Sequence, residues 1–211
     1  MKEVGEILKE EYDWDPTEVK KIWSFGDEDY CANVISDRTF GVQYMSDCKQ
    51  TMIIGFKNAV CEGPLCGEIV WGVQFNITDA KLHADPMHRG IGNVLPMLKK
   101  ACYGAMLSAE PRIQEPYFEV TVKTEEDKRG DVYSCISSRR GRVISDEIDS
   151  GKMITIKGHM PVAESFGFAT YLRDNTQGKA HPMTAFSHWE TVDSDPYQEG
   201  TMANQIVKEV R

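Results

Sequence analysis

Residues 69–109 read IVWGVQFNITDAKLHADPMHRGIGNVLPMLKKACYGAMLSA. Apolar and polar side chains alternate over 69–78, and this period of two predicts a strand. Over 93–109 the apolar side chains recur at the spacing of one helix face, which predicts a helix. Asn93 is expected to cap that helix, with Pro96 in its first turn. The loop between them holds two histidines, an arginine and two glycines. We therefore expect it to lie exposed at the tip of a strand-loop-helix unit.

The remaining patterns before residue 64 indicate a mixed α/β module. Asp15, followed by Pro16 and Glu18, is typical of a helix start with a capping box. The expected elements are a short acidic helix at 3–11, a helix from Asp15 to Gly26, a strand at 31–35 and a helix at 41–61. Gly63-Pro64 is expected to stop the last of these helices.

The second half follows a β-α-β-β-α-β order after a linker bracketed by Pro111 and Pro116. The expected elements are strands at 117–123, 142–145, 153–160 and 181–189, with helices at 125–137 and 162–175. This order predicts a ferredoxin-like split β-α-β fold, in which helices cover one face of an antiparallel sheet. The fold class is therefore α+β with two modules.

Composition places the chain among ordinary globular proteins. Hydrophobic residues make up 41% and charged residues 27% of 211 residues, enough for a sizeable core. No apolar run approaches the roughly 18 residues of a membrane helix, and no signal peptide is expected, so we predict a cytoplasmic protein with no membrane contact. The six cysteines are scattered, and Cys61-x4-Cys66 lacks a second pair. Reduced thiols in the core are therefore favoured over a zinc site.

Charge is unevenly distributed along the chain. The net charge of −9 argues against general nucleic-acid binding, and residues 1–40 contain eleven acidic and five basic side chains. Residues 81–103 instead contain Lys81, Arg89, Lys99 and Lys100 against Asp85 alone. A basic tip on an acidic body fits local contact with RNA. Charge alone favours the other interpretation, in which the two lysines belong to a solvated helix face.

The tip loop contains the residues best suited to chemistry. Two imidazoles and a carboxylate, at His83, His88 and Asp85, fit a metal site or an acid–base pair. A tight, exposed loop holds no fourth ligand and excludes no water, which argues against both. No Gly-x4-Gly-Lys-Ser/Thr motif occurs in the chain. We therefore expect neither GTP binding nor another cofactor.

Other polar and aromatic residues in the second half allow two interpretations each. Arg139, Arg140 and Arg142 follow a helix, where they would face RNA or neutralise the helix C-terminus. The phenylalanines around Gly167 are expected to pack on the sheet within one helix, with Gly167 permitting close contact. His181, His188 and Trp189 are expected to be core or edge residues rather than ligands.

These motifs resemble a known family. The tip matches the pattern Leu-His-x-Asp-x-x-His-Arg-Gly of domain IV of eukaryotic and archaeal elongation factor 2, the GTPase that moves tRNA and mRNA through the ribosome. The resemblance covers nearly all 211 residues. Its other segments are Glu11-Tyr12-Asp13-Trp14-Asp15, Lys21-Ile22-Trp23, Glu62-Gly63-Pro64, 111–116, Arg139-Arg140-Gly141, 160–168 and Phe186-Ser187-His188-Trp189.

The resemblance implies an organisation and a site. A domain IV-like tip module at 1–113, lacking its first strand, would precede a domain V-like ferredoxin module at 114–195. A helical tail at 196–211 would pack on the first module. His88 matches the histidine that the family converts to diphthamide, although Gly90-Ile91-Gly92-Asn93 stands where three glycines and a glutamine are usual. The implied RNA-contacting tip residues are His83, Asp85, His88, Arg89 and Gly90, with further rRNA contacts at Lys99, Lys100, Arg139, Arg140 and Arg142.

The resemblance also implies partners. The ribosome, with tRNA and mRNA at the decoding region, would be the main one, and the diphthamide-synthesis enzymes would be others. GTP and Mg²⁺ would bind in domains that lie outside this chain, so the chain itself would have no enzymatic activity. It is also expected to be a monomer. Two alternatives stay open. One is a stand-alone or split RNA-binding module that pairs with a separate GTPase, and the other is part of an elongation-factor-like GTPase of ribosome assembly or splicing.

Overall fold

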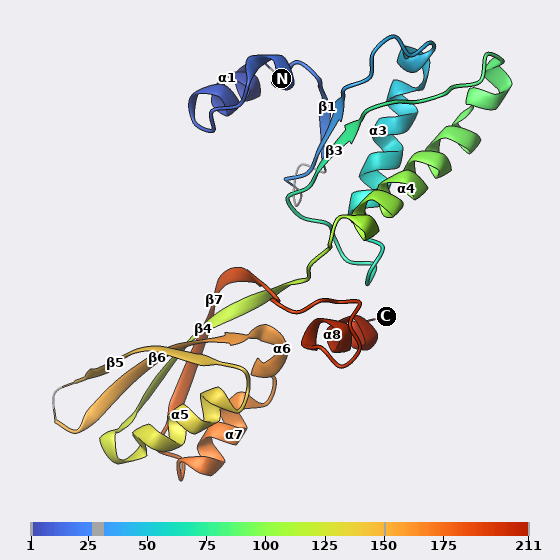
Figure 1. Cartoon of the computed structure of the whole chain (residues 1–211). Coiled ribbons are helices and arrows are strands. Elements are labelled where there is room, and N and C mark those ends of the chain that lie inside the picture. Colours follow the sequence, from blue (N-terminus) through green and yellow to red (C-terminus); the bar gives the residue numbers. More distant parts are fainter. Residues whose placement is uncertain (1, 27–31, 150, 211) are drawn as a thin grey trace. The chain divides into compact units, whose positions relative to one another are not determined.

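The computed structural model describes residues 2–26, 32–149 and 151–210. The chain divides into two compact units, residues 1–111 with 205–211 and residues 112–204 (Figure 1). Part of the strand expected at 31–35, Cys31, lies outside the described residues. Each unit has its own hydrophobic core.

The first unit contains a three-stranded sheet. Its strands are β1 (Ile22–Phe25), β2 (Val34–Asp37) and β3 (Gln74–Ile77), in the order β1-β2-β3. β1 pairs antiparallel with β2, and β2 pairs parallel with β3, so that Ile35 lies opposite Phe75. Parallel pairing requires a crossover connection, and the helix α3 (Met45–Cys61) provides it.

Two long helices of the first unit pack against each other. α3 and α4 (Ile91–Ser108) run side by side, with their first turns at the same end of the unit (Figure 1). Their contact is close because Gly55 has no side chain: a Cβ there would lie 3.1 Å from the carbonyl oxygen of Leu95. On α4 the buried side chains are Val94, Leu98, Cys102 and Met106, one at each turn. The helix pattern therefore predicted this packing face.

Several boundaries in the first unit differ from the predictions. The helix expected to run from Asp15 to Gly26 is a single turn, α2 (Pro16–Val19), and β1 follows it. The cap itself is confirmed, since Asp15 accepts a hydrogen bond from the Thr17 amide at 2.8 Å. A separate helix, α1 (Lys2–Glu10), precedes it as expected. The strand predicted over 69–78 is shorter because Gly72 has a positive φ of 71°, which interrupts extended backbone.

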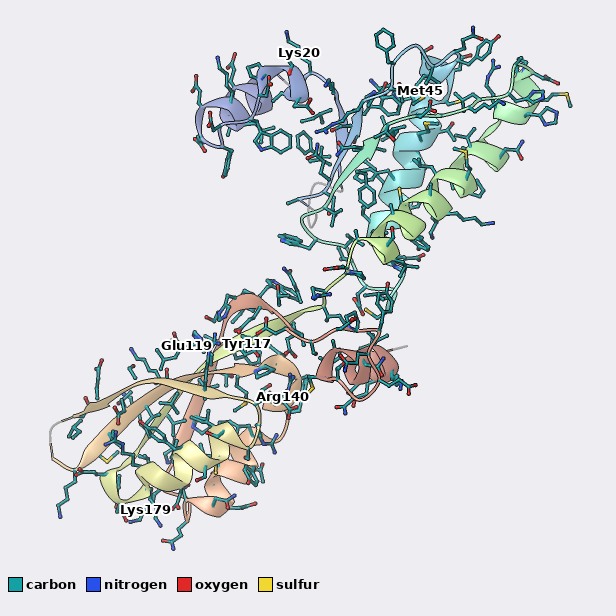
Figure 2. The ribbon with its side chains drawn as sticks, viewed as in Figure 1. Lys20, Met45, Tyr117, Glu119, Arg140 and Lys179 are labelled. Atoms are coloured by element: carbon teal, nitrogen blue, oxygen red, sulfur yellow. The ribbon has the colours of Figure 1, made fainter. Side chains whose placement is uncertain are left out.

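The second unit has the predicted ferredoxin-like sheet. Its strands are β4 (Gln114–Glu125), β5 (Arg142–Ile148), β6 (Met153–Pro161) and β7 (His181–Thr191). The sheet order is β5-β6-β4-β7, and all neighbours are antiparallel. Pro116, expected to close a linker, lies inside β4 and pairs with Trp189 of β7. Tyr117 and Glu119, labelled in Figure 2, also lie on β4.

Helices cover one face of this sheet (Figure 1). They are α5 (Arg129–Ser137), α6 (Val162–Ser165) and α7 (Phe168–Asn175), and they pack on buried side chains of β4 and β6 such as Val120 and Ile156. The single helix predicted at 162–175 is therefore wrong. It divides at Gly167, whose φ of 72° no right-handed helix allows, and Phe166 is left 76% exposed while Phe168 is buried.

The last described element is helix α8 (Met202–Val210). Two hydrogen bonds join its start to the preceding loop. The Ala203 amide donates to Ser194 Oγ at 2.9 Å, and the Asn204 side chain, within the helix, donates to the backbone carbonyl oxygen of Pro196 at 2.8 Å. None of the helices in the described part of the chain is long and apolar enough to cross a membrane.

Candidate functional site

The tip loop connects β3 to α4 and contains one short 3-10 helix, η1 (Pro86–Arg89). Asp85 caps it, since its Oδ1 accepts a hydrogen bond from the Met87 amide at 3.0 Å, and Pro86 occupies the first helical position. α4 then begins at Ile91, so Gly90 rather than Asn93 is the cap residue, and Asn93 instead donates to the carbonyl oxygen of His88 at 3.3 Å. The path of the loop is thus fixed by η1 and by the first turn of α4, which follows it directly.

His83 and His88 face each other at the surface of this loop. Their rings lie edge to face, with centroids 4.4 Å apart and an interplanar angle of 63°. Both side chains are exposed. The Asp85 amide donates to Nδ1 of His83 at 3.0 Å, so this nitrogen acts as the acceptor and the ring hydrogen is on Nε2. His83 is therefore fixed in orientation, and the exposed His88 ring lies against it.

The loop lacks the contacts that an acid–base pair or a metal site requires. The Asp85 carboxylate bonds to the Met87 amide rather than to either imidazole. Among the described residues, no group of three or more histidine, cysteine, aspartate or glutamate side chains is arranged to hold a metal ion. The assignment of this loop to RNA recognition therefore stays a prediction.

Arg89 has a different environment from the one expected. Its side chain is only 9% exposed, whereas a phosphate-binding arginine would extend from the loop. Nη1 donates to the carbonyl oxygens of His83 and Ala84, at 2.8 and 2.6 Å, and Nη2 donates to Asp47 Oδ2 at 3.1 Å. The guanidinium carbon lies 4.0 Å from the ring centroid of Tyr44. Arg89 thus binds inside its own unit, and the expected phosphate contact is not available in this conformation.

A second loop, residues 38–44, was missed by the sequence analysis, which placed most of it in a helix. α3 begins only at Met45 because Gly41 and Tyr44 both have positive φ, 69° and 64°. Phe40 is fully exposed, at 101% of its reference area. Since Tyr44 and Asp47 contact Arg89, this loop lies beside the tip loop. In the sequence, Asp37 and Thr39 signal only a turn after β2, because an aspartate that bonds two residues ahead is typical of a turn, and they do not signal the loop that follows.

The lysines predicted to contact rRNA differ in their surroundings. Lys99 bonds to Glu62 at 3.0 Å and lies 5.5 Å from the ring of Tyr103. The hydrogen bond to Glu62 raises the pKa of Lys99. Lys100 is exposed and has no ion pair in the described part of the chain. Only Lys100 of the two is therefore free to meet a polyanion.

The three arginines predicted to contact rRNA in the second unit are all engaged internally. Arg140, labelled in Figure 2, forms two hydrogen bonds with the buried Glu115, at 2.9 and 2.8 Å, and one with Glu164. Arg139 donates to the backbone carbonyls of Glu164 and Phe166. Arg142 pairs with Glu190 at 3.0 and 2.8 Å and stays largely exposed. Structural roles thus account for Arg139 and Arg140.

The histidines of β7 are edge residues. His181 and Trp189 are exposed. His188 stacks on Tyr117 at 5.6 Å and faces His159 of β6 at 4.8 Å, on the sheet face opposite the helices. Desolvation lowers the pKa of His159, and His188 and Arg142 lower it further. Sequence analysis did not predict this cluster because its members come from three strands.

Comparison with protein families agrees with this architecture. Residues 1–110 match the family model of elongation factor G, domain IV, and residues 112–200 match that of the elongation factor G C-terminus. Neither match is to a GTPase domain, and together they cover most of each unit. The chain therefore belongs to the elongation factor G family, of which it contains domain IV followed by the C-terminal domain.

Proposed function

We propose that this chain is the ribosome-engaging C-terminal part of a translation elongation factor of the elongation factor 2 branch. It would promote translocation of tRNA and mRNA by inserting the tip loop at the decoding region. The observation that carries the proposal is the exposed His88 on a loop fixed by the Asp85 turn and by Arg89. The His-Arg-Gly tip favours the elongation factor 2 branch within the family.

His88 would act by position rather than by acid–base chemistry. An imidazole offers a planar face for stacking on a base and a nitrogen donor for a hydrogen bond. The nearby Asp85 carboxylate accepts from the Met87 amide, and in the described residues it makes no hydrogen bond to His88. Two exposed apolar side chains, Met87 in the tip loop and Phe40 in the adjoining loop 38–44, would add apolar contact area. The tip would then keep codon and anticodon paired while the ribosomal subunits move.

The same exposure supports modification of His88 to diphthamide. The modifying enzymes need access to the imidazole ring, and His88 is exposed at the surface of the tip loop. Modification would add length and positive charge to a tip that otherwise presents few free cations. Mass spectrometry of the peptide containing His88, from the protein isolated from its own cells, tests this: an unmodified mass would contradict it.

GTP hydrolysis would reside outside this chain. No phosphate loop occurs in the sequence, so purified residues 1–211 should bind no nucleotide. Saturable micromolar binding of GTP would contradict this proposal. We further propose that the protein is a cytoplasmic monomer whose main partner is the ribosome.

Tethered probing tests the ribosomal placement most directly. A hydroxyl-radical source attached at His88→Cys, in a factor that carries this chain, should cleave rRNA of the small subunit at the decoding region. The same source at Lys123→Cys, on the exposed face of β4, provides the matched control. Identical cleavage from both positions, or none from position 88, would contradict the proposal.

A further inference from the structure

The position of Arg89 between two loops suggests a role that its neighbour His88 does not share. Its guanidinium has five N–H groups, of which three bond to His83, Ala84 and Asp47. A fourth, on Nε, is buried. A phosphate therefore could not replace these partners without opening the loop.

Tyr44 connects Arg89 to the neighbouring loop 38–44. It holds a left-handed conformation, φ 64° and ψ 12°, immediately before α3, with no side-chain cap for the helix. Such a conformation is unfavourable for a residue with a side chain unless surrounding contacts maintain it. The stack of the Arg89 guanidinium on the Tyr44 ring, at 4.0 Å, is such a contact. The conformation of loop 38–44 is thus linked to Arg89.

We propose that Arg89 is a positioning residue, which joins the loops 38–44 and 82–90 and fixes His88, rather than a phosphate-binding residue. The contacts of Arg89 with His83, Ala84, Asp47 and Tyr44 are called the Arg89 bridge below. The significance of the bridge for translation rests on the proposed function. The bridge itself is a property of the free chain.

Arginine is the only side chain that can make all of these contacts. The planar fork reaches two carbonyl oxygens with one nitrogen and a carboxylate with the other, while its face stacks on an aromatic ring. A lysine ammonium has no such plane and would keep at most part of the set. Arg89→Lys should therefore behave like Arg89→Ala in loop order, although it preserves the charge.

Hydrogen exchange in the free 211-residue chain tests the bridge. The Asp85, Met87 and His88 amides are bonded only within the tip loop. In Arg89→Ala and Arg89→Lys they should exchange about tenfold faster or more, since charge-assisted hydrogen bonds are lost. Lys100→Ala, which removes an exposed cation eleven residues after Arg89, should leave their exchange unchanged.

A double-mutant cycle distinguishes the bridge from general loosening of the unit. Asp47→Ala should accelerate the same amides less than Arg89→Ala does, because it removes only one contact of the bridge. In a chain that already has Arg89→Ala it should add little more, because that contact is already lost. Amides in the middle of α3, such as that of Phe56, should keep their protection in every variant. Additive effects of the two changes, or loss of the α3 protection together with the loop, would overturn the proposal.

Ribosome binding separates this inference from the proposed function. A lost phosphate contact would lower the slope of log affinity against log salt by nearly one. The Arg89 bridge predicts an unchanged slope for Arg89→Ala with weaker engagement. A reduced slope with unchanged loop exchange overturns the bridge. Faster loop exchange in a chain whose wild type never engages the ribosome supports the bridge and overturns the proposed function instead.

Discussion

Replacing Arg140 with alanine should destabilise the second unit markedly. Arg140 forms two parallel hydrogen bonds with Glu115, whose residue exposure is only 9%. Removing one partner of a buried ion pair costs about 3–5 kcal/mol because the other charge stays buried without compensation. The Arg140 side chain is itself 24% exposed, so water partly replaces it and we expect about 2–3 kcal/mol. Arg140 has a left-handed φ of 55°, which is unfavourable for arginine and alanine alike, so the backbone adds nothing to the expected loss of stability.

Arg142 provides the matched control. It binds Glu190 with the same two-bond geometry, but the side chains are 57% and 32% exposed. Exposed pairs contribute about 0–1 kcal/mol, so Arg142→Ala should change stability little. Replacing both Arg140 and Glu115 with methionine and leucine should restore most of the loss, because no buried charge remains.

Urea unfolding of the whole chain, followed by hydrogen exchange of β4 and β6 amides, measures the second unit separately. A loss of about 2 kcal/mol corresponds to a fall in melting temperature of roughly 8–16 °C for a unit of this size. Equal stability losses for Arg140→Ala and Arg142→Ala would refute the argument from burial. Unchanged stability of Arg140→Ala together with weaker ribosome binding would restore the prediction that Arg140 contacts rRNA.

Three further predictions follow from single contacts. In urea unfolding, Gly141→Ala should destabilise the second unit by about 1–3 kcal/mol, because the new Cβ would lie 2.8 Å from the Ile136 carbonyl oxygen. Gly130→Ala, where a Cβ meets no neighbouring atom on helix α5, should instead stabilise it by about 0.5–1 kcal/mol. His159 has a lowered pKa in the folded chain, so stability is complete above its ordinary value of 6.5 and declines as pH falls below it; His159→Gln should reduce that decline between pH 7 and pH 5. Burial raises the pKa of Cys102 to about 11, so a thiol reagent should label the exposed Cys61 in the native chain and Cys102 only after unfolding.

The sequence predicted those elements whose pattern reports burial directly. Val120 and Val122 alternate with polar residues along β4, as do Ile154 and Ile156 along β6, and all four are buried. Local rules also predicted the cap at Asp15, because a side chain that bonds two residues ahead needs no distant partner. The ferredoxin-like order of strands and helices could therefore be predicted from local patterns alone.

Features decided by distant partners were not predictable in the same way. Ile22–Phe25 follows a good helix start, yet it forms β1 because pairing with β2 outweighs local propensity. Arg89 lies in a loop with two glycines nearby, and this local sequence is compatible both with an arginine that binds phosphate and with one that binds groups of its own chain. Its partner Asp47 is 42 residues away, so only the fold shows which applies.

The exposure of the tip could be predicted, but its second loop could not. Histidines between a strand and a helix are expected at a surface, and His83 and His88 lie there. Phe40 gave no signal, because a single exposed aromatic residue looks like a core residue in the sequence. Its loop is recognised only from the positive φ at Gly41 and Tyr44.

The most direct test of the account is reading-frame maintenance by a translocation factor that carries this chain with either His88→Ala or His83→Ala. The account predicts that His88→Ala binds ribosomes nearly as well as the wild type but raises frameshifting, since the lost contact acts during movement. His83→Ala should have a smaller effect, through the orientation of the His88 ring 4.4 Å away. Frameshifting that is equal or greater for His83→Ala would contradict the assignment of His88 as the RNA-facing residue of the tip.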